Sequence, residues 1–160
     1  MRSMPVAVLL SLSASAALAQ GTPTQGDSHA VIVMPDQVTW APAPPSLPAG
    51  AKAAVLEGNP KEAGPFTMRL SLPDGYRIPP HSHPAAERIT VIQGTFQLGM
   101  GDKFDGSALN SMPVGSYTSM QPGTHHFVQA KGKTIVQLNG IGPWKLNYVN
   151  PADDPSKKTP

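Results

Sequence analysis

Apolar and polar side chains alternate over short segments separated by turns through most of the chain after residue 65. Residues 66–72 show this alternation, and Pro73-Asp74-Gly75 follows them as a turn. Lys131-Gly132-Lys133 is the expected hairpin connection between two such segments. Short strands about ten residues apart, with no long helical pattern, predict an antiparallel barrel or sandwich. The other expected strands lie at 88–93, 95–100, 116–120, 126–130, 134–139 and 144–149.

The segment before residue 66 has a weaker pattern. Residues 31–33 and 38–40 are rich in β-branched side chains and are expected as short strands. Residues 41–50 contain four prolines, which favour polyproline-like or turn conformations and make this stretch a candidate cover for an edge strand. Residues 51–57 fit a helix by propensity and a strand by context.

The composition is that of one folded domain. The chain has 160 residues, of which 39% are hydrophobic and 14% are charged, so it can bury a core without disulfide bonds. Its 19 prolines and 15 glycines favour turns and short strands over long helices. The net charge is +2 with scattered Lys and Arg residues, which argues against nucleic-acid binding. Because cysteine is absent, disulfides and a lipid-modified N-terminal cysteine are excluded.

Residues 1–19 have the three parts of a secretory signal peptide. Arg2 supplies a positive charge, an apolar run extends from Val6 to Ala17, and Ala17-Leu18-Ala19 offers a cleavage site. The apolar run is too short for a membrane span, so we expect no stable membrane anchor. The alternative is an N-terminus that is disordered or packed into the core. We expect a protein that is periplasmic or secreted after removal of the signal.

These patterns divide the chain into four parts. We expect the signal peptide at 1–19, a flexible linker at 20–30, one β-barrel at 31–150 and a polar tail at 151–160. No internal sequence repeat is present, so one barrel rather than two is the natural count.

Two histidines and a glutamate form a tight cluster near the middle of the chain. His81 and His83 flank Ser82, so in a strand both histidine side chains point to the same face. Glu87 follows after Pro84 has bent the path, and it can turn back onto the same centre. Imidazole and carboxylate groups together are the ligands of a borderline divalent metal. The alternative is that these are surface histidines in a proline-rich loop.

A fourth ligand is expected from elsewhere in the fold. His125 and His126 are adjacent, so in a strand only one of them can face the barrel interior. Three imidazoles and one carboxylate leave one or two exchangeable positions on a five- or six-coordinate metal. This ligand set suits Fe, Mn, Ni, Co or Zn and does not choose among them.

The run from Gly75 to Gly94 resembles the first motif of the cupin superfamily, G-x5-H-x-H-x3-E-x6-G, in every residue and spacing. The run from Gly115 to Ala130 is similar to the second motif, G-x5-P-x-G-x2-H-x3-N. Gln121 replaces the proline of that motif, Ala130 replaces the asparagine, and His126 stands at the histidine. The resemblance implies an all-β fold, a single conical antiparallel β-barrel of the cupin or jelly-roll type. The metal ligands that it implies are His81, His83, Glu87 and His126.

A narrower resemblance links the chain to small single-domain bacterial metal-binding cupins. Residues 101–105 and 141–144 are similar to stretches in the cupin module of anti-sigma factors and in diketone-cleaving dioxygenases. Cupins commonly dimerise through edge strands and N-terminal segments, so the resemblance also implies a homodimer as one assembly.

Several further side chains are candidates for the surroundings of the site. Ile89, Val91 and Val128 share the parity of the ligands and are expected to line a small apolar pocket. Arg69 lies within an apolar strand: facing inward it would anchor a carboxylate or an enolate, and facing outward it would be solvated. The other candidates for the pocket, or for partners of the ligands, are Tyr76, Gln97, His125 and Met120.

We therefore expect an exported metal-binding cupin that acts as an enzyme on a small oxygenated molecule at a mononuclear metal centre. The substrate would chelate the metal through a carbonyl, enolate or carboxylate oxygen. A dioxygenase-type reaction is the most specific form of this expectation, and a lyase or isomerase would use the same ligands with a non-redox metal. The alternative function is a non-catalytic module that binds or senses a small ligand, with a structural metal.

Overall fold

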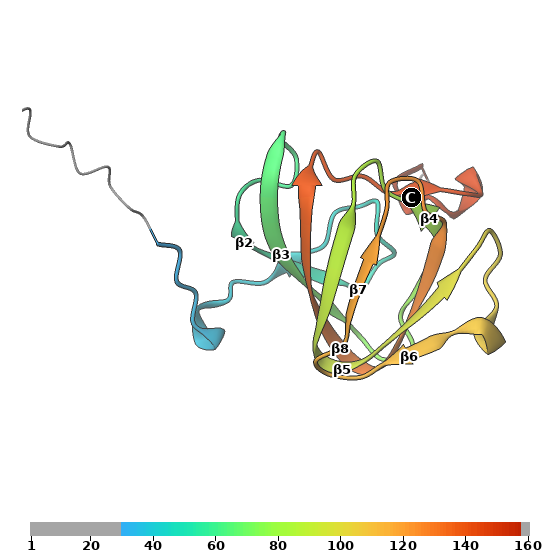
Figure 1. Cartoon of the computed structure of the whole chain (residues 1–160), viewed down its shortest axis with the longest axis horizontal. Helices are drawn as coiled ribbons and strands as arrows, with labels where there is room; N and C mark the ends of the chain where they lie inside the picture. The colour runs from blue at the N-terminus through green and yellow to red at the C-terminus, as the bar shows by residue number, and fades with distance from the viewer. Residues whose placement is uncertain (1–29, 158–160) are drawn as a thin grey trace, which may run out of the picture. The chain divides into compact units, whose positions relative to one another are not determined.

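The computed structural model describes residues 30–157, and its regular elements are almost all β-strands (Figure 1). Between these two residues there is no α-helix, and the helical segments are single turns of 3-10 helix. The strands are β1 (Ala41–Pro42), β2 (Lys52–Glu57), β3 (Gly64–Leu72), β4 (Arg77–Ser82), β5 (Glu87–Met100), β6 (Asn110–Met112), β7 (Tyr117–Met120), β8 (His126–Gly142) and β9 (Asn147–Tyr148). The short helices are η1 (Pro35–Gln37), η2 (Gly106–Ala108), η3 (Pro151–Asp153) and η4 (Pro155–Lys157).

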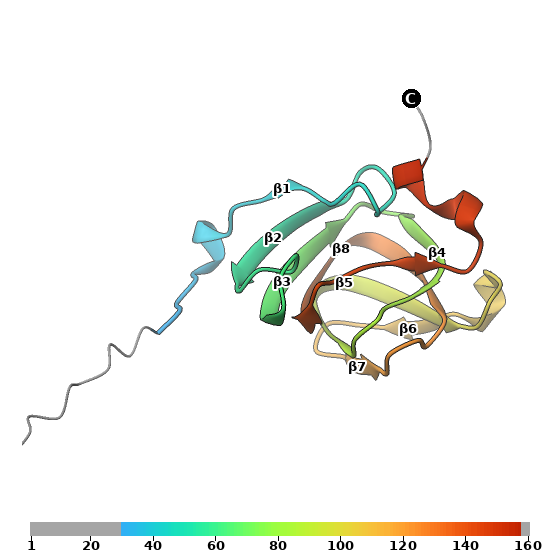
Figure 2. The same ribbon diagram turned by 90° about the horizontal axis from the view of Figure 1, so that it is seen from above.

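Strand β8 is the centre of the sheet because it pairs with three other strands. Its first part pairs with β4, its second part pairs with β3, and β5 runs antiparallel to it along both parts. From β3 the sheet continues to β2 and β1, and from β4 it continues to β9, while β6 and β7 pair with β5. Figure 2 shows the strands curving around a common interior. The predicted all-β antiparallel barrel is confirmed, although the strand order from β1 to β9 is an open path.

Strands β5 and β8 are longer than the sequence pattern predicts. We expected a break at Gly94 and a hairpin at residues 131–133, but each long strand runs continuously through that point. Gly94 and Gly132 both have positive φ, at +73° and +70°, and the β5–β8 register shifts beside Gly94. These glycines bend the two paired strands together, as β-bulges do. The predicted hairpin is wrong, because both halves of β8 pair with β5 rather than with each other.

Alternate residues of the strands fill the interior of the barrel. On β3 the side chains of Phe66, Met68, Leu70 and Leu72 are each no more than 4% exposed, and the residues between them are half-buried. This is the alternation that the sequence predicts for residues 66–72. The second half of β8 shows the same period of two. The core therefore lies inside the curved sheet, and the metal-ligand candidates must reach it from inward positions.

The N-terminal part differs from the expectation in several places. Residues 31–33 and 38–40 are not strands, and the first pairing in the described chain is that of β1 with β2. Residues 51–57, which fitted either a helix or a strand, form β2 because β3 offers them a partner edge. Of residues 144–149, only the two residues of β9 are paired as a strand. Pairing partners, rather than β-branched composition alone, decide these cases.

The proline-rich segment between β1 and β2 packs against the barrel. Leu47 is 4% exposed and belongs to the main hydrophobic core. The hydroxyl of Tyr148 donates to the carbonyl oxygen of Ser46 at 2.7 Å, and the hydroxyl of Tyr76 donates to that of Pro48 at 2.5 Å. The segment therefore contributes a side chain to the barrel interior.

The predicted signal peptide at 1–19 lies outside the described residues, as does nearly all of the predicted linker at 20–30. Among the helices between residues 30 and 157, none has the length and apolar character needed to cross a membrane.

Gly94 tests the importance of the bend in β5. A Cβ atom at this position would lie 2.5 Å from the carbonyl oxygen of Lys133, and the positive φ also disfavours a side chain. We expect Gly94→Ala to lower the free energy of unfolding by about 1–3 kcal/mol, measured by urea denaturation. Gly106→Ala is the matched control, because a Cβ there meets no atom within 4 Å, and it should change stability by less than about 1 kcal/mol. Equal losses in the two variants would contradict this account.

Candidate metal centre

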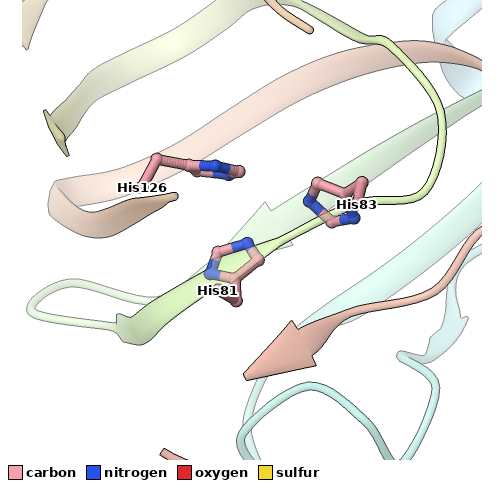
Figure 3. Close-up of side chains that lie close together, drawn as sticks. All are labelled: His81, His83 and His126. Atoms are coloured by element: carbon pink, nitrogen blue, oxygen red, sulfur yellow. The ribbon is translucent and has the colours of Figure 1, made fainter. Parts of the chain in front are cut away.

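Three buried histidines come together where strands β4 and β8 are neighbours (Figure 3). His81 on β4 lies directly opposite His126 on β8, and His83 follows just after the end of β4. One ring nitrogen from each of the three lies within 4.8 Å of the other two. His81, His83 and His126 are 2%, 5% and 1% exposed. The pairing of β4 with β8 therefore brings the two sequence motifs into one site.

Backbone carbonyl groups fix the orientation of all three rings. The Nδ1 atom of each histidine lies within hydrogen-bond distance of a carbonyl oxygen. Because a carbonyl oxygen can only accept a hydrogen bond, each Nδ1 carries the proton and each Nε2 keeps its lone pair. This is the tautomer that binds a metal through Nε2. The accepting groups are those of Pro79 for His81 (2.8 Å), Lys145 for His83 (2.7 Å) and Thr124 for His126 (3.0 Å).

Burial favours the neutral form of the three rings. Loss of hydration is the largest cause that lowers the pKa of His81, His83 and His126, and it brings the pKa of His83 to about 4. The neighbouring histidines lower the pKa of His81 further, because two positive charges would repel at this distance. The rings are therefore ready to coordinate a metal at neutral pH, since a protonated ring has no lone pair to offer.

Glu87, at the start of β5, lies beside the three histidines. Its Oε1 atom is 3.3 Å from Nε2 of His83, and its Oε2 atom is 3.7 Å from Nε2 of His126. The residue is 3% exposed, and the indole N–H of Trp144 donates to Oε1 at 3.2 Å. Burial raises the pKa of Glu87 to about 7, while His126 and the Trp144 hydrogen bond act in the opposite direction.

The donor set fits a divalent metal ion. Nε2 of His83 is the one buried side-chain polar atom in the described chain that has no hydrogen-bond partner. A carboxylate oxygen of Glu87 lies 3.3 Å from it, and two lone pairs at that distance repel unless a proton or a cation lies between them. A cation held by the three Nε2 atoms would remove both difficulties. Three buried histidines can hold a metal ion, and this donor set does not select which metal.

The histidines open onto a small cavity in the barrel interior. The centre of a water molecule can reach about 20 Å³ of it, which is room for about one water. Ile89 and Val128 line the cavity, as predicted, whereas Val91 is buried in the core but is not part of this wall. Apart from the four candidate ligands, the wall is apolar except for the indole of Trp144.

Arg69 and Gln97 face away from the cavity. Arg69 lies between Met68 and Leu70, whose side chains are buried, so strand parity turns it outward, where its Nε donates to Gln137 at 3.3 Å. The outward orientation is therefore the one that the structure shows. Gln97 has the opposite parity to its buried neighbours on β5 and donates to Ser111 on β6.

Tyr76, His125 and Met120 are also absent from the cavity wall. Tyr76 is buried, with its hydroxyl on a backbone carbonyl group, and burial raises its pKa. His125 is exposed, and its Nδ1 lies 2.6 Å from Asp102. Met120 is buried in the core opposite Glu87 in the β5–β7 pairing. His125 precedes β8 and is exposed, whereas His126 begins β8 and is buried, so one of the two adjacent histidines faces the interior, as expected.

Two irregular segments contribute to the site in a way that was not predicted. The ring of Trp144 stacks on His83, with centroids 5.3 Å apart and planes at 15°, and its N–H reaches Glu87. Leu47 lines the cavity from the proline-rich segment. Both lie in irregular segments far from the ligands in sequence, where no periodicity indicates an inward side chain.

Comparisons with known proteins agree with this fold. A search of curated protein sequences found no match. The polyketide cyclase RemF from Streptomyces resistomycificus has a similar structure, with a TM-score of 0.63 and 17% identity over 79% of this chain and 89% of that one. An acetylacetone dioxygenase from Acinetobacter johnsonii has a TM-score of 0.59 and 15% identity over 85% and 87% of the two chains. A cupin described as RmlC-like, from Shewanella frigidimarina, has a TM-score of 0.54 and 13% identity over 71% and 91%.

A family model supplies the identification that these distant structures do not. The model described as the ChrR cupin-like domain matches residues 28–143, which is most of the chain. The matched region contains both sequence motifs and the three histidines of the site, and it confirms the cupin resemblance. The chain belongs to the ChrR cupin-like domain family.

Proposed function

We propose that this chain is a metal-dependent enzyme that acts on a small oxygenated molecule at a mononuclear centre. The observation that carries the proposal is the fixed orientation of the three histidines. Each Nδ1 is bound to a backbone carbonyl group, so three Nε2 lone pairs converge in one buried cavity. A barrel that served stability alone would gain nothing from an unpartnered Nε2 on His83, because a buried unsatisfied polar atom is destabilising.

We assign Glu87 as the fourth ligand. Its two oxygens already face Nε2 of His83 and Nε2 of His126, so a metal among the histidines would lie beside the carboxylate. The hydrogen bond from Trp144 orients that carboxylate, as the partners of metal ligands commonly do. The position against the ligands favours coordination by Glu87 over a role as general base.

The chemistry follows from the ligand set and the apolar wall. A bound divalent metal would polarise a carbonyl, enolate or carboxylate oxygen of the substrate and, if it is a redox metal, activate dioxygen. Ile89, Val128 and Leu146 make the cavity wall apolar and favour a substrate whose remaining atoms are apolar. The structural likeness to an acetylacetone dioxygenase supports dioxygen-dependent cleavage of a diketone-like compound as the most specific form of the proposal.

We also propose that the protein is exported. The support is the amino-acid sequence of residues 1–19, in which a positive charge, an apolar run and a small-residue cleavage site follow in the order of a signal peptide.

A second candidate function is a module that binds or senses a small ligand without turnover. The observation that favours it is the burial of the site, since the three histidines and Glu87 are all 5% exposed or less. The cavity beside them has room for about one water molecule. In this role the metal would stabilise the barrel or hold one compact ligand.

Replacement of one histidine tests the metal site. We expect the purified protein to hold about one divalent metal per chain in elemental analysis, and His126→Ala to weaken metal binding by about 100-fold or more. His125→Ala is the matched control, because this neighbouring side chain is 43% exposed and lies on the surface beside Asp102. The control should keep its metal. Loss in both variants, or in neither, would contradict the assignment of His126.

Oxygen uptake separates the two candidate functions. Protein loaded with Fe(II) is mixed with pentane-2,4-dione in an oxygen electrode, and His126→Ala serves as the blank. Consumption of dioxygen that requires both the diketone and His126 is the result expected of the enzyme. Metal-loaded protein that binds the diketone and consumes no dioxygen would instead support the binding module.

The pKa of Glu87 predicts how metal affinity changes with pH. In the metal-free protein this pKa is about 7, so below pH 7 the carboxyl group holds a proton that the metal must displace. The pKa of His83 is about 4, so that ring stays neutral over the same range. We expect metal affinity to fall about tenfold for each pH unit between roughly pH 6.5 and 5, and to be nearly constant above about pH 7.5. Chelator competition at a series of pH values measures this slope.

Glu87→Gln is the control for that slope, because it removes the titrating group and preserves the size of the side chain. The variant should bind metal more weakly at pH 8 and lose the dependence between roughly pH 6.5 and 5. An unchanged slope in Glu87→Gln would assign the displaced proton to another group.

A further inference from the structure

One part of the cavity wall comes from the proline-rich connection between β1 and β2. Residues 43–50, a segment we name the strap, lead from β1 toward β2 and place Leu47 among the lining residues. Leu47 is 4% exposed and packs in the main core. The other lining residues lie on β3, β4, β5 and β8 or in the loops that follow β4 and β8.

Leu47 limits the room beside the metal site. The free space has the size of about one water molecule, and the rest of the volume around the histidines is filled by apolar side chains. A carbonyl compound that carries an alkyl chain of several carbons does not fit while Leu47 is in place. Such a ligand can enter only if one part of the cavity wall moves. The part that moves is expected to be the segment that is least firmly attached to the rest of the barrel.

The strap is less firmly attached than the barrel strands. The strands are held by ladders of backbone hydrogen bonds, whereas the three prolines of the strap have no N–H to donate to a ladder. Two of its carbonyl groups, those of Ser46 and Pro48, accept hydrogen bonds from the hydroxyls of Tyr148 and Tyr76. Each of these is a single side-chain contact. The strap also has a backbone hydrogen bond from Leu47 to Pro44, within the strap itself, and one from Ala43 to Ala51 at its base, and neither ties Leu47 to a barrel strand.

The loop after β8 is the other irregular wall, and it is tied to the metal ligands themselves. Trp144 donates to Glu87 through its indole and to Pro60 through its backbone N–H, and the carbonyl group of Lys145 accepts from His83. Movement of this loop would disturb two candidate ligands. Within the strap, by contrast, Leu47 is the residue that lines the cavity, and the hydrogen bonds of the strap go to Tyr76, Tyr148 and Ala51 rather than to a candidate ligand.

We propose that Leu47 is the specificity-determining residue of this metal centre. With Leu47 in place, the centre prefers the most compact oxygen ligands, and affinity falls as the carbon chain of the ligand grows, because a longer chain binds only by displacing the Leu47 side chain. The inference rests on the proposed metal site, and it implies that a diketone, the most specific substrate proposed above, binds only with the Leu47 side chain displaced.

Ligand titrations of the cobalt-loaded protein test this role. Formate, acetate, butanoate and hexanoate are titrated into protein loaded with Co(II), whose visible absorption changes when a ligand binds. The unaltered protein should prefer formate and acetate. Leu47→Ala should bind hexanoate about 10- to 100-fold more tightly than the unaltered protein does, because the alkyl chain fills the vacated apolar space. Its affinity for formate should change by less than about threefold.

Leu98→Ala is the matched control. Leu98 is 6% exposed and belongs to the same core, but it is not part of the cavity wall. Its removal should lower stability without altering the order of ligand affinities. If Leu47→Ala keeps the order of the unaltered protein, or if Leu98→Ala changes the order equally, the role of Leu47 is overturned and the metal site stands. If Leu47→Ala does not fold, Leu47→Val should show the same change on a smaller scale.

Xenon binding tests the role of Leu47 in protein that holds no metal. In metal-free protein, xenon NMR should detect an apolar site in Leu47→Ala that is absent from the unaltered protein, because dry apolar cavities take up xenon. If Co(II) fails to bind the unaltered protein, the proposed function is refuted. Even in that case, xenon uptake by Leu47→Ala would show that the Leu47 side chain fills the cavity. Absence of xenon uptake would refute the proposed role of Leu47 as well.

Discussion

The hydrogen bonds from the three histidine rings to backbone carbonyl groups are the constraint on which the site depends. A free imidazole exchanges its proton between two nitrogens, and a carbonyl group beside Nδ1 removes that freedom. For His81 and His126 the accepting carbonyl lies two residues earlier in the chain, so the local backbone sets the orientation of the ring. For His83 it belongs to Lys145, so the loop after β8 sets the third orientation. Local and long-range structure therefore act on the same three lone pairs.

Strand β8 connects this arrangement to the rest of the fold. It carries His126, it pairs with β4 where His81 lies, and it pairs along its length with β5, which begins at Glu87. A shift of one residue between β4 and β8 would turn one set of side chains to the opposite face and separate the histidines. The bend at Gly94 lets β5 follow β8 around the barrel, so β5 contributes to the core at both of its ends. The sheet register, more than contacts within the site, holds the ligands together.

The sequence was a better guide to the histidines than to the strand boundaries, for a physical reason. Strand periodicity is two, so His81 and His83 share a face wherever the strand is placed. A glycine with positive φ, however, fits a turn and a bend equally well, and Gly132 proved to belong to a bend within β8. The direction of the Arg69 side chain could not be predicted either. Alternation defines two faces of the strand, and only the register with the neighbouring strands shows which face is buried. What the sequence leaves open in these cases is the choice of pairing partner.

The two irregular segments at the site, the strap and the loop after β8, show how this site separates two tasks. Trp144 and Leu47 both line the cavity from irregular segments, and Trp144 in addition donates a hydrogen bond to Glu87 and stacks on His83. A substitution at Trp144 would therefore alter the orientation of Glu87 and, as a result, the affinity for the metal. A change at Leu47 would alter the space beside the metal and leave the donor atoms in place. The cupin motifs specify the donors alone, so the choice of ligand in this chain depends on a proline-rich segment that those motifs do not include.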